Sequence, residues 1–203
     1  MAHHTNQHIR TQIAQEAAKI ILEEGVNDYQ LAKRKAIERL RVNDRAPLPR
    51  NVEIETAIRN HQKLFYTQED YSHQFALWKA ALESMRFLQP FKPRLVGSLL
   101  NGTAGKDSSV NIHVFADALE DVLIFFLNAS IPYQSAEQRV RLGTESRCYP
   151  MLRHRVVDIE IETVVFPDKA LRAAPHSAID GKPMKRAEIS EVEKRAAAIY
   201  GKS

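Results

Sequence analysis

Apolar side chains recur at helical spacing through the N-terminal part of the chain, as far as Pro90. They fall in four stretches, residues 9–22, 31–40, 54–65 and 75–85. Gly25 is placed to end the first helix and Asp28 to cap the second. Pro90 and Pro93 then interrupt the helical pattern. We therefore expect a helical bundle over residues 1–92 and a second domain over residues 93–203.

After Pro93 the pattern changes to short β-type segments. Alternation predicts a strand at residues 110–115, and β-branched residues predict a single long strand at residues 156–166. Shorter strands are expected at residues 94–96, 139–142 and 149–154, and a helix at residues 117–128. A last helix is expected from Ser190, which would act as its N-cap with Glu193 completing a capping box. Helices followed by a small mixed sheet predict an α+β fold.

Composition narrows the class of protein without identifying it. The formal net charge is +4, which is compatible with an anionic partner but does not require one. The single cysteine, Cys148, excludes a disulfide framework within the chain and fits a reducing compartment. The longest apolar run, residues 122–127, is too short to cross a bilayer, and the N-terminus lacks the apolar core of a signal peptide. We expect a cytoplasmic protein with no membrane partner; its oligomeric state is left open.

The stretch VGSLLNGTAGKDSSVNIHVFAD, residues 96–117, has glycine steps suited to phosphate binding. A P-loop requires G-x-x-x-x-G-K-[ST], in which backbone N–H groups surround the phosphates and the hydroxyl holds Mg²⁺. Gly105 and Lys106 supply the centre of that motif. However, Leu100 stands where the first glycine is needed and Asp107 where the hydroxyl is needed. The P-loop is therefore disfavoured.

A second pattern fits the same stretch better. Gly97-Ser98 follows a short strand, Gly102-Thr103 forms the next glycine step, and Ser109-Val110-Asn111 opens the following strand. In this order and spacing, residues 94–166 resemble the nucleotidyltransferase superfamily of the DNA polymerase β type. The resemblance implies a nucleotidyltransferase-like domain in which a nucleotide's phosphates lie near Gly97, Ser98, Gly102 and Thr103, with Lys106 close by.

The chain departs from the family where that family holds its metals. Ser109 and Asn111 occupy the positions of two aspartates, and neutral oxygens attract a hard dication far less than carboxylates do. A third acid of the family comes from a neighbouring strand, for which Asp158, Glu160 and Glu162 are candidates. The resemblance thus implies Mg²⁺ held weakly or not at all, with Asn111 and these three acids as its candidate ligands. The alternative is an ordinary solvated acidic strand face, paired with arginines on neighbouring strands.

Three functional hypotheses follow, and none assigns a catalytic residue. The first is a degenerate nucleotidyltransferase-like protein, a pseudoenzyme that binds a nucleotide or another anion with weak or no transferase activity. The second is an active metal-dependent transferase that uses Asp158, Glu160 or Glu162. The third is a helix-turn-helix-like nucleic-acid-binding protein, suggested by basic residues that include Lys33, Arg34, Lys35, Arg39 and Arg41.

Overall fold

The computed structural model describes residues 2–26, 28–43, 46–142 and 145–200. The chain divides into two compact units. The first, here called the helical unit, comprises Met1–Tyr71 and Gly102–Ser108. The second, the sheet unit, comprises Ser72–Asn101 and Ser109–Ser203. The boundary expected between residues 92 and 93 lies inside the sheet unit. The helical unit also includes Gly102–Ser108, which belongs to the glycine-rich stretch.

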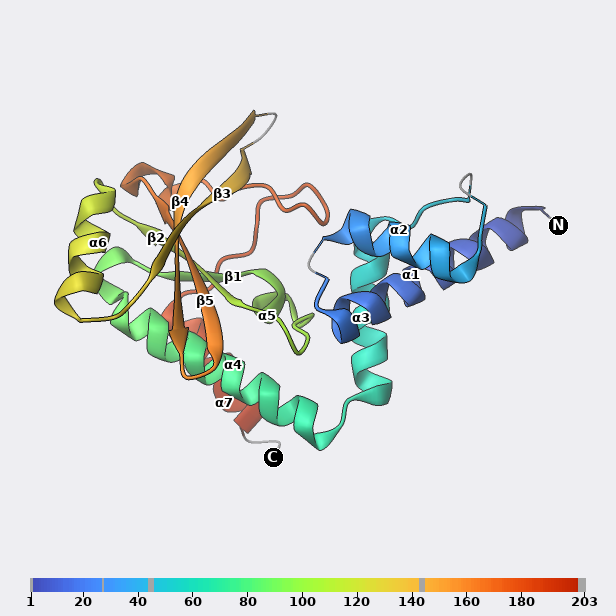
Figure 1. Ribbon diagram of the computed structural model, residues 1–203, viewed down its shortest axis with the longest axis horizontal. Helices are drawn as coiled ribbons and strands as arrows, with labels where there is room; N and C mark the ends of the chain where they lie inside the picture. The colour runs from blue at the N-terminus through green and yellow to red at the C-terminus, as the bar shows by residue number, and fades with distance from the viewer. Residues whose placement is uncertain (1, 27, 44–45, 143–144, 201–203) are drawn as a thin grey trace. The chain divides into compact units, whose positions relative to one another are not determined.

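Three helices build the helical unit, as their apolar spacing predicts. They are α1 (Ala2–Glu24), α2 (Tyr29–Leu40) and α3 (Asn51–Phe65) (Figure 1). Gly25, with a φ of +65°, directly follows α1, and the Asp28 carboxylate accepts hydrogen bonds from the backbone N–H groups of Gln30 and Leu31. Both helix-boundary predictions are confirmed. The core of this unit is formed by fully buried apolar side chains of all three helices, including Ile13, Ala17, Ile20, Ala32, Ala36, Ile54 and Ile58.

The sheet unit is a five-stranded mixed sheet with helices packed against it. The boundary between the units falls inside α4 (Gln68–Phe87). After α4, the elements of the sheet unit follow in this order: η1 (Gln89–Phe91), β1 (Arg94–Val96), α5 (Gly97–Asn101), β2 (Val110–Phe115), α6 (Leu119–Asn128), β3 (Gln134–Leu142), β4 (Glu145–Val156), β5 (Ile159–Phe166), η2 (Asp168–Arg172) and α7 (Ile189–Tyr200). The strand order is β1-β2-β5-β4-β3; β2 and β5 run parallel and the other neighbours antiparallel. N-terminal helices followed by this sheet confirm the α+β class.

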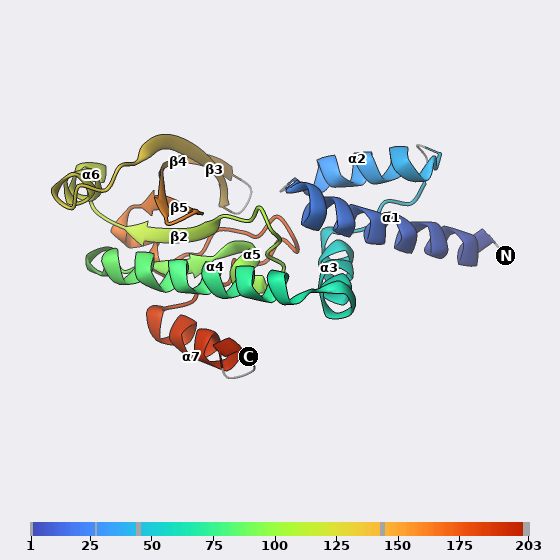
Figure 2. The same ribbon diagram turned by 60° about the horizontal axis from the view of Figure 1, so that its bottom comes forward.

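The two faces of the sheet have different surroundings. Side chains alternate along a strand, so Asn111 of β2 and Glu162 of β5 lie on one face while their neighbours in sequence lie on the other. On that other face the His154 ring of β4 is 5.1 Å from the ring of Phe126 in α6, and Phe126 also contacts Phe87 of α4. In both views α4 runs along the sheet (Figures 1 and 2). The face that carries Asn111 and Glu162 is therefore opposite the one on which α6 packs.

Several sequence-based boundaries differ from the structure. The strands expected at residues 139–142 and 149–154 are parts of the longer β3 and β4. Residues 156–166 do not form one strand, because β4 ends at Val156 and β5 begins at Ile159, with Val157 and Asp158 in a tight turn between them. Val157 has a φ of +54° and is 87% exposed, which is uncommon for a β-branched residue. The last helix begins at Ile189, because the Glu188 carbonyl already accepts from the N–H groups of Glu191 and Val192. Ser190 is therefore inside the helix and is not its cap.

Among the helices that the structure describes, none has the length and apolar character needed to cross a membrane.

Candidate functional site

The bend after β1 requires a glycine and lies against β2. Gly97 has a φ of +79°, in the left-handed region that L side chains rarely adopt. A Cβ atom at this position would lie 3.3 Å from both Cβ and Nδ2 of Asn111. Val96, the residue before the bend, is the register partner of Asn111. The absence of a side chain at Gly97 thus allows the bend to approach Asn111 closely.

Asn111 and Glu162 are register partners across the parallel pair of β2 and β5. The hydroxyl of Ser109 is 3.2 Å from Oε2 of Glu162, and Nδ2 of Asn111 donates to the backbone carbonyl of Ser109 at 3.2 Å. On the other side of β5, Nε of Arg153 donates to Oε1 of Glu162 at 3.0 Å. We call Ser109, Asn111, Glu162 and Arg153 the β2–β5 cluster. It lies next to Gly97 within the sheet unit.

The charges of this cluster are distributed unevenly between interior and solvent. The side chain of Glu162 is 18% exposed, whereas that of Arg153 is 42% exposed. Both carboxylate oxygens of Glu162 are engaged, one by the guanidinium and one by the Ser109 hydroxyl. A guanidinium carries five N–H donors, and only Nε is directed at Glu162 by these contacts. The arrangement therefore presents a cation toward solvent over a half-buried acid whose two oxygens are both hydrogen-bonded.

Of the three acids predicted to share one strand face, Glu160 and Glu162 do so in β5, and Asp158 does not. Asp158 lies in the turn before β5, and its backbone carbonyl accepts a hydrogen bond from Nη2 of Arg155. Glu160 is exposed and is the register partner of Arg155. Of the three, Glu162 is the acid that contacts the strand of Asn111. The prediction of one continuous acidic strand is corrected, because the turn at residues 157 and 158 removes Asp158 from β5.

The described residues contain no group of three or more histidine, cysteine, aspartate or glutamate side chains arranged to hold a metal ion. Asn111 and Glu162 alone would offer one neutral and one charged oxygen donor, whereas Mg²⁺ demands six ligands in near-octahedral geometry and is usually bound through carboxylates and phosphates. The role of Asn111, Asp158, Glu160 and Glu162 as metal ligands stays a prediction.

The second half of the glycine-rich stretch belongs to the helical unit. The Ala104 carbonyl accepts hydrogen bonds from Nε2 of Gln62 at 3.0 Å and from the Tyr66 hydroxyl at 2.9 Å. A Cβ atom on Gly105 would lie 3.3 Å from the backbone of Leu22, and one on Gly25 would collide with the Asp107 side chain. The segment Gly102–Ser108 is therefore anchored to the ends of α1 and α3.

Residues predicted to bind phosphate, among them Thr103 and Lys106, belong to this anchored segment. Thr103 is only 4% exposed, and the Lys106 ammonium lies 3.7 Å from Asp70. Hydrogen bonds from the backbone and hydroxyl of Thr67 hold the pKa of Asp70 below its ordinary value, and Lys106 adds to that effect. Gly97 and Ser98 belong to the sheet unit, whereas Gly102, Thr103 and Lys106 belong to the helical unit. Their common role in phosphate binding stays a prediction.

Buried polar groups lie farther along the sheet face that carries the β2–β5 cluster. His113 is 5% exposed, and burial, with a smaller contribution from the Arg186 guanidinium, lowers its pKa to about 3. Arg186 lies over the rings of Phe115 and Phe166, at 5.1 and 5.6 Å, and its Nη1 donates to the Ala170 carbonyl. His113 is thus neutral and packed near pH 7. Arg186 anchors its loop to η2, in the basic segment before α7.

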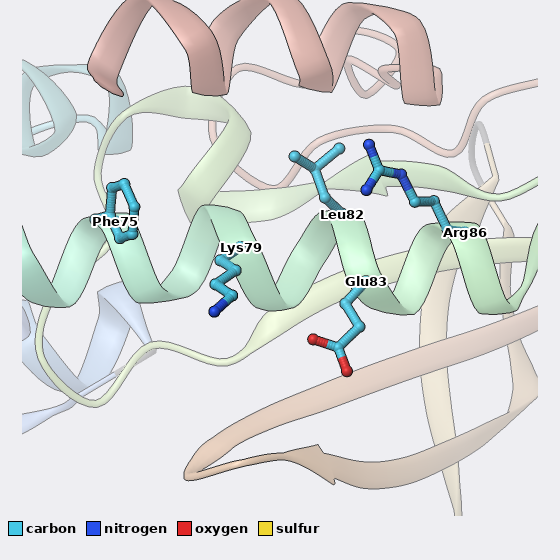
Figure 3. A pocket seen from close by; sticks show the side chains of 5 residues that line it. All are labelled: Phe75, Lys79, Leu82, Glu83 and Arg86. Atoms are coloured by element: carbon cyan, nitrogen blue, oxygen red, sulfur yellow. The ribbon is translucent and has the colours of Figure 1, made fainter. Parts of the chain in front are cut away.

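Two hollows lie elsewhere on the two units. One, of about 520 Å³, follows α4 and is lined by Phe75, Lys79, Leu82, Glu83 and Arg86. Figure 3 shows Leu82 and Arg86 on the side of α7 and Lys79 and Glu83 on the opposite side; Arg86 donates to Glu193 of α7. The other, of about 710 Å³, lies in the helical unit along α1 and α3. Neither hollow is lined by a residue of the β2–β5 cluster.

The basic residues of α2 are partly engaged inside the helical unit. Lys35 Nζ donates to Glu24 at 2.9 Å, and Arg39 pairs with both Glu24 and Glu16. Lys33 is only 6% exposed, and its burial lowers its pKa. These pairs reduce the positive charge that α2 would offer to a nucleic-acid phosphate.

Sequence reasoning missed the importance of Arg153. It could be found only as one of several arginines on a neighbouring strand, because its pairing with Glu162 depends on the β4–β5 register.

Comparison with known proteins adds no relative: the sequence matches no protein-family model, and no curated protein matches it. The candidate site therefore rests on the motif and on the geometry of the sheet unit.

Proposed function

We propose that this chain is a degenerate nucleotidyltransferase-like protein that binds a nucleotide, or another phosphate-bearing anion, with weak or no transferase activity. One observation carries the proposal: Gly97, Asn111 and Glu162, which come from three separate elements of the chain, adjoin one another on one face of the sheet. These are the positions at which the family resemblance expects a phosphate-binding bend, a metal-binding strand and a third acid.

Weak or absent transfer chemistry follows from the donor set. Two-metal phosphoryl transfer requires anionic ligands that hold two cations about 4 Å apart. Here Ser109 and Asn111 are neutral, and the carboxylate of Glu162 is already paired with Arg153. The active-transferase hypothesis receives less support, because Asp158 is in a turn and Glu160 is opposite Arg155. The nucleic-acid hypothesis receives less support from the ion pairs of Lys35 and Arg39.

Thermal unfolding of the full chain in the presence of nucleotides tests the proposal. ATP, CTP, GTP and UTP are each added with and without Mg²⁺. A ligand at ten times its dissociation constant stabilises the folded state by about 1.4 kcal/mol, which raises the midpoint by roughly 4 °C for a protein of this size. We expect such a rise with at least one nucleotide. The absence of any rise under all these conditions would contradict the proposal.

A parallel assay separates binding from chemistry. Incubation with labelled nucleotide and Mg²⁺, followed by analysis for labelled products, is expected to show little or no transfer. Rapid transfer that depends on Glu162 would instead favour the active metal-dependent enzyme.

A further inference from the structure

We infer that Arg153 supplies the positive charge of this site, so that the phosphate group of the ligand is bound directly by a guanidinium and without a divalent cation. The inference rests on the proposed function and deepens it by specifying the ligand as a metal-free phosphoanion. The observation that carries it is the placement of Arg153 against the half-buried acid of the β2–β5 cluster.

Glu162 is the only acid of the β2–β5 cluster, and both of its carboxylate oxygens already accept hydrogen bonds. Oε1 of Glu162 accepts from Nε of Arg153 at 3.0 Å, and Oε2 lies 3.2 Å from the Ser109 hydroxyl. Mg²⁺ surrenders its water molecules reluctantly and requires oxygen ligands at short distances. To coordinate Glu162, it would have to share an oxygen that already accepts a hydrogen bond from the guanidinium or from Ser109. The resident cation and the divalent ion therefore compete for the same carboxylate.

The contact with Glu162 uses one of the five N–H donors of the Arg153 guanidinium. The Arg153 side chain is 42% exposed, and the contact with Glu162 uses Nε alone. The two terminal nitrogens of a guanidinium form a planar fork that matches two phosphate oxygens. Because Nε is held by Glu162, the fork is pre-positioned, and a phosphate bound there would lose less side-chain entropy than one bound by an unconstrained arginine.

Glu162 has two opposing effects on the binding of an anion beside Arg153. Glu162 positions Arg153, yet its negative charge repels an approaching anion. Replacing the carboxylate by the isosteric amide removes that repulsion and retains an oxygen that can accept from Arg153 or Ser109. The Glu162→Gln protein should therefore bind a phosphoanion more tightly than the wild type. A site that recruits Mg²⁺ through Glu162 would respond in the opposite direction.

The chain offers a matched control for Arg153. Arg155 lies two residues farther along β4 and on the same face, because side chains alternate along a strand. Its Nη2 donates to the Asp158 carbonyl in the turn, and its register partner is the exposed Glu160. Substitution of Arg155 removes the same charge from the same strand at a position outside the β2–β5 cluster.

Isothermal titration of the full-length protein with ATP, inorganic pyrophosphate and adenosine, in EDTA and in excess MgCl₂, tests the inference. We expect wild-type protein to bind ATP in EDTA at least as tightly as in MgCl₂. Arg153→Met should weaken this binding about tenfold or more, as loss of a charged hydrogen bond predicts. Arg155→Met should change it by less than about twofold, as for an exposed charge. Arg153-dependent binding of pyrophosphate, with none of adenosine, would assign the contact to the phosphates.

The outcomes distinguish failure of the metal-free site from failure of nucleotide binding itself. ATP binding in MgCl₂ alone, or equal losses in Arg153→Met and Arg155→Met, would overturn the metal-free site while leaving nucleotide binding established. No binding of ATP in either buffer would contradict the proposed function and the inference together. Arg153→Lys, which keeps the charge but loses the fork, gives an independent variant if Arg153→Met fails to fold; it should bind with intermediate affinity.

A second measurement does not depend on the nucleotide. Mn²⁺ binding, followed by electron paramagnetic resonance, should be stronger in Arg153→Met than in the wild type, because the substitution frees the Glu162 carboxylate. It should be unchanged in Arg155→Met. Mn²⁺ binding to the wild type that Arg153→Met does not increase would contradict the competition between guanidinium and metal.

Discussion

Asn111 and Glu162 face each other across the only parallel pair among the described strands, at the level where the bend at Gly97 meets the sheet. Neither residue by itself supplies the paired carboxylates that a two-metal site requires. Their adjacency arises because β2 and β5 are neighbours in the sheet although residues 116–158 lie between them in the sequence. Parallel pairing of this kind requires a long connection, which here consists of α6 and the β3–β4 hairpin.

Gly97→Ala should destabilise the sheet unit and disturb the candidate site. The left-handed backbone costs an L residue about 1–2 kcal/mol, and the added Cβ would also press on Asn111 at 3.3 Å. Gly102→Ala is the matched control, since Gly102 has a similar φ of +71° and no atom within 4 Å of an added Cβ. Urea unfolding should show a larger loss for Gly97→Ala. Nucleotide binding, by the thermal assay, should be weakened in Gly97→Ala; unchanged binding in that variant would remove the Gly97 bend from the site.

The free energy of unfolding should fall as the pH is lowered through the range of the buried histidines. Burial lowers the pKa of His113 to about 3 and that of His154 to about 4, from an ordinary value of 6.5. Below pH 6.5 the unfolded chain takes up protons that the folded chain excludes. Each histidine therefore removes about 1.4 kcal/mol of stability per pH unit over its window.

His113→Leu isolates this contribution from that of the carboxylates. Denaturant unfolding is measured in buffers at pH 7, 6, 5 and 4. The free energy of unfolding should depend less steeply on pH in the variant than in the wild type. His8→Gln, at an exposed position of α1, serves as the control and should follow the wild-type curve. Parallel curves for wild type and His113→Leu would mean that His113 takes up a proton in the folded state.

Tyr66→Phe should loosen the segment Gly102–Ser108. The substitution removes the hydroxyl that donates to the Ala104 carbonyl at 2.9 Å, at a cost of about 1 kcal/mol. Gln62 still donates to the same carbonyl, so the segment should remain attached. Hydrogen exchange should be faster across residues 102–108 than in the wild type. Tyr71→Phe, whose exposed ring keeps its edge-to-face contact with Tyr66, should leave this exchange unchanged.

Asp28→Ala should weaken α2 by the usual cost of an N-cap. The Asp28 carboxylate accepts from the N–H groups of Gln30 and Leu31 at 2.6 and 3.0 Å. Its removal is expected to lower the free energy of unfolding by about 1 kcal/mol, whereas Asp28→Asn retains a side-chain acceptor and should lose less. Chemical denaturation of the three proteins measures both effects. Equal stability of Asp28→Ala and the wild type would mean that the cap contributes nothing net.

Local sequence signals predicted the helices of this fold well. Gly25 and Asp28 act through their own backbone and nearest neighbours, so their positions are visible in the sequence. The turn at Val157 and Asp158 escaped prediction because it contains neither glycine nor asparagine, the usual residues at positive φ. Val157 adopts that conformation because the β4–β5 pairing on both sides fixes the turn.

The candidate site was only partly accessible to the same reasoning. The approach of Gly97 to Asn111 was implied by motif spacing, and Glu162 was among three acids proposed. The choice of Glu162 and the pairing with Arg153 depend on strand register, which a missed turn shifts. The contacts of Ala104 with Gln62 and Tyr66 join residues about forty positions apart in sequence, as the separations of 42 and 38 show, and no local signal marks them.

The segment Gly102–Ser108 also determines how this chain can be cut. The backbone passes from one unit to the other at residues 71/72, 101/102 and 108/109, which makes three passages. Ending the polypeptide after residue 92 would deprive Gln62 and Tyr66 of the carbonyl to which they donate, and starting it at residue 93 would discard all of α4. A single cut after residue 108 would keep the helical unit whole but with residues 72–101 of the sheet unit attached, and no single cut separates the two units. The two units are interleaved along the polypeptide, so neither can be expressed whole as one continuous segment without residues of the other.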